Sequence, residues 1–82
     1  MTQGQIIGRL RKAAHVKQQE LADAVGLTSK GNFSSWEKGT VPMPDHWFKA
    51  CWDAIPLLLG QYREEYEQEK AELVARGDVT AT

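Results

Sequence analysis

Gly26 separates two short amphipathic stretches, and this arrangement restricts the fold more than any other feature of the chain. In residues 18–25 the apolar side chains recur at positions i, i+1 and i+4, on one face of an α-helix. They are Leu21, Ala22 and Val25. Glycine readily adopts the left-handed backbone that ends a helix and turns the chain. Downstream, Phe33 and Trp36 predict the buried edge of a second short helix, which Gly39 ends. The sequence therefore predicts two helices joined by a tight turn.

The second of these helices has a polar face made of short side chains. Thr28 or Ser29 is expected to cap it, because a hydroxyl there accepts a backbone N–H. The polar side chains are Ser29, Lys30, Asn32, Ser34 and Ser35. A helix with such a face fits a DNA major groove and reaches base edges, so we interpret these five as candidate base contacts. On composition alone, the solvated side of a small bundle is the commoner explanation. Gly31 weakens the first turn, so either the helix starts near Asn32 or residues 29–32 order on DNA.

Three segments resemble the Cro/C1-type (XRE-like) helix-turn-helix family of phage repressors and bacterial regulators. They are IGRLRKA at residues 7–13, QQELADAVGLT at residues 18–28 and SSWEKG at residues 34–39. The resemblance covers residues 5–55, and residues 28–33 contain one residue more than is usual in that family. It implies an all-α, five-helix, lambda-repressor-like bundle whose partner is double-stranded DNA. The extended C-terminal helix expected for this chain is longer than the last helix usual in that family.

The resemblance also implies roles for residues outside the polar face. Arg11 is expected to form a partly buried pair with Glu37 at the end of the second motif helix; the alternative is two unrelated surface charges. Gln18 is expected to grip the DNA backbone, or else only to occupy the first helical turn. The free N–H groups at that helix start favour phosphate. The candidate phosphate contacts are Lys17, Gln18, Lys38 and Thr40.

The composition favours one small domain with its charge unevenly distributed. The net charge of the 82 residues is −1, but residues 1–51 carry +3 and residues 52–82 carry −4. Binding to phosphate needs only a local positive surface, so this balance does not exclude DNA. Cys51 stands alone, so no internal disulfide forms, and we interpret it as a small buried hydrophobe. We find no pattern for a metal, a cofactor, a small-molecule ligand, a signal peptide or a membrane span, and we expect a cytoplasmic protein.

Three further helices are expected around the motif, over residues 5–15, 45–54 and 57–76. Pro56 is expected to open the last of these, which would be about 30 Å long. Its sparse apolar stripe contains Tyr62, Tyr66 and Leu73. The stripe either packs on its own domain, zips against a partner subunit or stays half solvated, and we favour the partner subunit. The expected organisation is a helix-turn-helix domain at 1–56, a dimerisation helix at 57–76 and a disordered tail at 77–82.

Two functions from different classes follow from these features. The first is a sequence-specific transcriptional regulator, a homodimeric repressor that binds a near-palindromic operator and occludes a promoter. Its small size suits a phage or mobile-element regulator or an antitoxin. The second is a protein-interaction module that keeps the helix-turn-helix fold without specific DNA binding. No nucleophile–base pair, carboxylate pair or phosphate loop indicates an enzyme.

Overall fold

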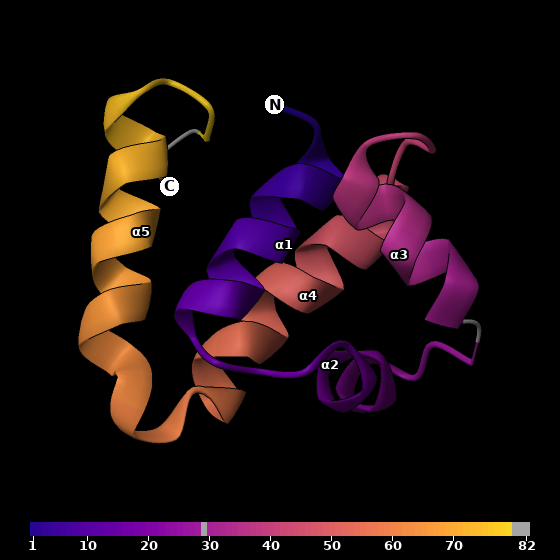
Figure 1. The fold of residues 1–82 in the computed structure, drawn as a ribbon, viewed down its shortest axis with the longest axis horizontal. Helices are drawn as coiled ribbons and strands as arrows, with labels where there is room; N and C mark the ends of the chain where they lie inside the picture. The colour runs from indigo at the N-terminus through magenta and orange to yellow at the C-terminus, as the bar shows by residue number, and fades with distance from the viewer. Residues whose placement is uncertain (29, 80–82) are drawn as a thin grey trace.

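The described part of the chain is an all-α bundle of five α-helices (Figure 1), as the sequence predicted. The structure is a computed structural model that describes residues 1–28 and 30–79, and the side chain of Lys30 is not described. The elements are α1 (Gln3–Ala13), α2 (Gln18–Val25), α3 (Lys30–Lys38), α4 (Asp45–Leu58), a 3₁₀ turn η1 (Gly60–Tyr62) and α5 (Arg63–Ala75).

Helix α1 lies at the centre of the bundle and contacts α3, α4 and α5. Figure 1 shows α5 and α3 on opposite sides of it. The helix begins two residues earlier than predicted, because Thr2 and Gln5 form a reciprocal cap. The Gln5 backbone N–H donates to Thr2 Oγ1 at 3.2 Å, and the Thr2 N–H donates to Gln5 Oε1 at 2.9 Å. Both exchanges satisfy N–H groups that a helix start leaves unpaired.

The prediction that Pro56 opens the last helix is wrong, because α4 runs through Pro56 and ends at Leu58. Ile55 and Leu59 on either side of the proline are both buried in the core. Their burial keeps the chain helical despite the missing N–H of proline. The chain turns instead at Gly60, whose φ of 55° lies in the left-handed region that glycine tolerates best. As a result α5 starts at Arg63 and has 13 residues, so it is shorter than the predicted helix.

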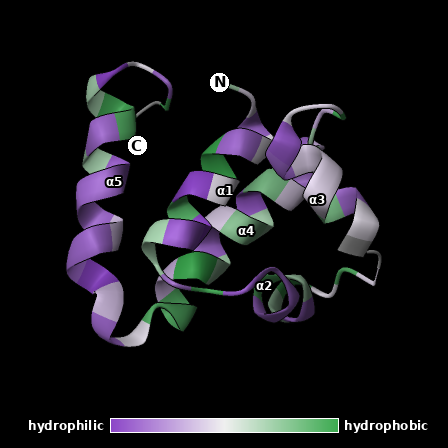
Figure 2. Ribbon diagram, in the orientation of Figure 1, coloured by the Kyte–Doolittle hydropathy of each residue, from purple (hydrophilic) through white to green (hydrophobic). Residues whose placement is uncertain are grey.

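The stripe predicted to face a partner subunit packs within the chain. Tyr66 and Leu73 are each about 1% exposed and belong to the same core cluster as residues of α1–α4. Tyr62 stacks on His15, with ring centroids 3.9 Å apart. Figure 2 shows α5 as a largely hydrophilic helix. Only its few apolar side chains can therefore pack against the core. Of the three alternatives for this stripe, the burial of Tyr66 and Leu73 favours packing on its own domain.

Polar contacts complete the docking of α5. Arg9 Nε lies 2.6 Å from Glu69 Oε1, and His15 Nε2 lies 2.7 Å from Glu65 Oε2. Lys70 Nζ lies 4.8 Å from the centroid of the Trp52 ring, a cation–π arrangement that links α5 to α4. These contacts orient an acidic helix that has little apolar surface of its own.

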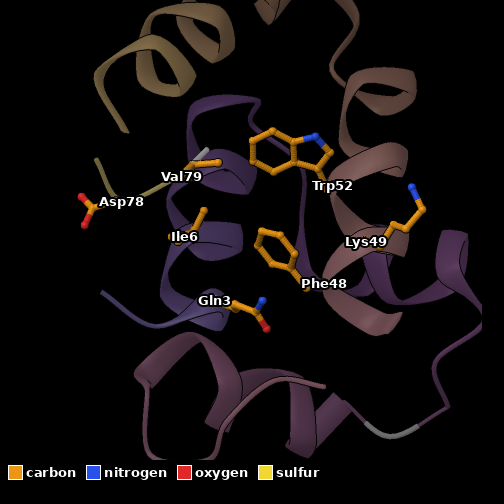
Figure 3. A pocket seen from close by; sticks show the side chains of 7 residues that line it. All are labelled: Gln3, Ile6, Phe48, Lys49, Trp52, Asp78 and Val79. Carbon is orange, nitrogen blue, oxygen red and sulfur yellow. The ribbon is translucent and has the colours of Figure 1, made fainter. Parts of the chain in front are cut away.

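The segment after α5 folds back onto the bundle. The Asp78 N–H donates to the Leu73 carbonyl at 3.0 Å, and Val79 packs against the core. Residues 77–79 of the tail predicted to be disordered make these contacts, and residues 80–82 lie outside the described residues. This return creates a groove of about 380 Å³ between α1 and α4. Figure 3 shows the side chains that line it. Its apolar lining is Ile6, Phe48, Trp52 and Val79. The groove shares no residue with α2 or α3.

Candidate nucleic-acid interface

Helix α2 has the bounds that periodicity predicted, and its two ends are both defined locally. At its start the Lys17 backbone N–H donates to Glu20 Oε1 at 3.2 Å. At its end Gly26 has a φ of 79°, and the Leu27 N–H donates to the Ala22 carbonyl at 2.9 Å. This left-handed cap turns the chain sharply and brings Leu27 against the core. Helix α3 then begins at Lys30.

Helix α3 divides into a buried face and a polar outer face. Phe33 and Trp36 are buried, as expected from their spacing. Of the described candidate base contacts, Asn32 is exposed and Ser34 and Ser35 are half-buried. The helix begins at Lys30, so the alternative of a start near Asn32 is wrong. The candidate Ser29 and the side chain of Lys30 lie outside what the structure describes.

The structure brings Arg11 and Glu37 together in a bidentate pair. Arg11 Nε donates to Glu37 Oε2 at 2.7 Å, and Arg11 Nη2 donates to Glu37 Oε1 at 2.9 Å. Arg11 Nη1 also donates to the Val16 carbonyl at 2.8 Å. The side chains of Arg11 and Glu37 are only about 11% and 10% exposed. The hydrogen bonds of this buried pair are well formed. Loss of either partner would leave the other charge buried and uncompensated.

Gln18 joins this pair and extends it to α2. Its Nε2 donates to Glu37 Oε1 at 2.9 Å. One carboxylate on α3 therefore accepts hydrogen bonds from α1 and from the first residue of α2. We call Arg11, Gln18 and Glu37 the Glu37 clamp. The Glu37 clamp fixes the three helices relative to one another. The hydrogen bond from Gln18 to Glu37 was not predicted from the sequence.

The remaining candidate phosphate contacts lie beside this clamp and are exposed. Lys17 directly precedes α2, and Lys38 is the last residue of α3. The Lys38 carbonyl accepts a hydrogen bond from Gln5 Nε2 at 3.4 Å. Thr40 Oγ1 donates to the Ser35 carbonyl at 3.2 Å. Within the described residues Lys12, Lys17 and Lys38 form no ion pair, so their charge is available to an outside partner.

Two glycines of α1 make this arrangement possible, and the sequence analysis missed them. A Cβ at Gly4 would lie 2.0 Å from the Trp36 carbonyl oxygen, and one at Gly8 would lie 3.2 Å from Glu37 Cγ. The end of α3 thus rests directly on the backbone of α1. The available signal was the spacing of four residues between the two glycines, which places both on one helix face.

Cys51 lies in the interior as a fully buried side chain. Burial, followed by the charge of Glu37, raises the pKa of its thiol to about 12. Across residues 1–28 and 30–79 no group of three His, Cys, Asp or Glu side chains is placed to hold a metal ion. Nor does any helix in that part of the chain combine the length and apolar character needed to cross a membrane.

The chain was compared with known protein families, with curated proteins and with solved structures, and none of them matches it.

Proposed function

We propose that the chain is a sequence-specific DNA-binding regulator of the Cro/C1 type. In this proposal α3 enters the major groove, while the start of α2, Lys38 at the end of α3 and Thr40 after it contact phosphates. The observation that carries the proposal is the polar outer face of α3, held rigidly to α1 and α2 by the Glu37 clamp. A rigid support matters because base readout requires side chains held in one register on the duplex.

The chemistry of this face favours DNA over a protein partner. Protein interfaces usually centre on exposed Trp, Tyr or Arg side chains. Here Phe33 and Trp36 point into the core, and the described outer face carries Gly31, Asn32 and short hydroxyls. The acidic α5 lies on the opposite side of α1 (Figure 1), so its negative charge is kept away from α3.

We propose further that two copies bind one inverted-repeat operator and repress by occluding a promoter. Half-sites about 34 Å apart would place two α3 helices in successive major grooves. Since Tyr66 and Leu73 are already buried, the second copy would use another surface. Leu57, at the end of α4, is 85% exposed and is the most exposed large apolar side chain among the described residues.

Selection of duplexes from a random pool tests the proposal directly. The selected duplex and a scrambled control are titrated at several salt concentrations, and the number of chains per duplex is measured by sedimentation. We expect the selected duplex to bind at least about 10³-fold more tightly than the control, with two chains on an inverted repeat. Equal affinity for both duplexes would overturn the proposal and favour the protein-interaction module.

Matched variants assign roles within the interface. Asn32→Ala should weaken binding to the selected duplex by about 1–3 kcal/mol and leave the scrambled duplex nearly unchanged. Lys38→Gln should weaken both and lower the salt dependence by about one phosphate contact. The control is Lys49→Gln, which removes the same charge from an exposed site on α4. If Lys49→Gln weakens binding as much as Lys38→Gln does, the assigned face is incorrect.

A further inference from the structure

Gly31 is the one glycine of this chain whose presence the fold itself does not explain. Gly26, Gly39, Gly60 and Gly77 have positive φ angles between 55° and 82°. Gly4 and Gly8 lie against α3, where a Cβ would be crowded. At Gly31 the φ lies outside the left-handed region, and a Cβ would meet no atom within 4 Å. A methyl group would therefore fit the isolated protein at this position.

A glycine at this position also has a cost. Gly31 is the second residue of α3 and is exposed. A glycine within a helix is less favourable than alanine by up to about 1 kcal/mol, because it loses more backbone freedom on folding. A nine-residue helix is too short to form without tertiary support. The chain thus keeps a residue that weakens a nine-residue helix and has no side chain to pack against the rest of the fold.

We infer that Gly31 is a point of closest approach between α3 and DNA, where the helix backbone packs directly on the duplex. The inference rests on the proposed DNA-binding function. The neighbouring side chains agree with it, because Asn32, Ser34 and Ser35 are all short. Ser35 Oγ donates to the Gly31 carbonyl at 3.3 Å, so this hydroxyl lies folded along the helix. A major groove about 12 Å wide barely admits a helix with its side chains, so removing one side chain allows deeper insertion.

Two substitutions of Gly31 distinguish its effect on stability from its effect on DNA binding. Gly31→Ala and Gly31→Leu both introduce good helix formers, so both should raise the urea midpoint of unfolding. Both should weaken binding to the selected duplex, Gly31→Ala by roughly tenfold and Gly31→Leu by more, because a group added to a close-packed contact is overpacked. Gln68→Ala, at an exposed site on α5, is the control for a stabilised helix and should bind DNA like the wild type.

Each outcome of this experiment decides between the alternatives. Higher midpoints together with a loss of affinity that grows with side-chain size support the inference. A loss for the selected duplex alone would place Gly31 against base edges, and an equal loss for the scrambled duplex would place it against the sugar-phosphate backbone. Unchanged affinity in both variants overturns the inference while leaving the proposed function intact. If the wild type itself shows no preference for the selected duplex, the proposed function fails, and the inference fails with it.

Discussion

At the scale of single residues, Tyr66 combines complete burial with an unused polar group. Its side chain is about 1% exposed, and its hydroxyl has no hydrogen-bond partner within the described part of the chain. A buried hydroxyl without a partner loses its hydration and gains nothing in return. Tyr66→Phe should therefore leave the free energy of unfolding unchanged or raise it by up to about 1 kcal/mol. Urea titration at neutral pH measures this, and a clear loss of stability would reveal a hydrogen bond to that hydroxyl.

The same residue predicts how stability depends on alkaline pH. Burial, followed by the charge of Glu67, raises the pKa of Tyr66 above its ordinary value of 10.0. The folded state holds this proton more tightly than the unfolded chain does. The resulting stabilisation is fully present below pH 10 and is lost as the pH rises through the higher pKa of the folded state. Between about pH 8 and about pH 11 the wild type should lose more stability than Tyr66→Phe, and parallel losses would contradict the assignment.

At the scale of helices, the contact between α1 and α3 depends on the absence of a side chain at Gly4. A Cβ there would lie 2.0 Å from the Trp36 carbonyl oxygen, so the end of α3 would have to move away. We expect Gly4→Ala to lower the free energy of unfolding by about 1–3 kcal/mol, the usual cost of overpacking. Urea midpoints measure the loss, with Gly31→Ala as the control where the added methyl meets nothing. Equal midpoints for the two variants would show that α3 does not rest on α1 as described.

The helices also show what sequence patterns determine and what they leave open. The bounds of α2 follow from its periodicity and from Gly26, because both signals are local. The stripe of Tyr66 and Leu73 was recognised, but periodicity identifies an apolar face and does not tell which surface covers it. Pro56 was expected to start a helix, yet the burial of residues on both sides of it decided the local structure. That burial is a tertiary property, and no pattern within one segment reports it.

In the candidate site, too, some contacts could be predicted from the sequence and others could not. The Arg11–Glu37 pair came from the family resemblance, since a separation of 26 residues carries no local signal. The hydrogen bond from Gln18 to Glu37 depends on how α2 sits on α3, so it emerged only from the structure. Short polar residues on α3 were identifiable in advance, because Phe33 and Trp36 fix which face is buried. Their contacts with DNA remain predictions.

At the scale of the whole molecule, Cys51 reports on global opening. Its thiol is fully buried and its pKa is about 12, so the reactive thiolate is scarce and inaccessible in the folded state. A disulfide reagent at neutral pH should therefore label Cys51 only through unfolding. The labelling rate should rise about tenfold for each 1.4 kcal/mol of stability lost, so Gly4→Ala should react faster than the wild type. Rapid labelling that is insensitive to urea would instead indicate local opening of α4.

The Glu37 clamp has a consequence for how such a sequence can diverge. Arg11, Gln18 and Glu37 lie on three helices and share one carboxylate, so a change at any of them alters the constraints on the other two. We expect these three positions to covary in descendants of this chain. Within the described part of α3, Asn32 and its exposed neighbours form no hydrogen bond with the residues of the Glu37 clamp. Under the proposed function, drift at those positions could alter which operator is recognised while the scaffold stays fixed, so target choice and folding would evolve separately.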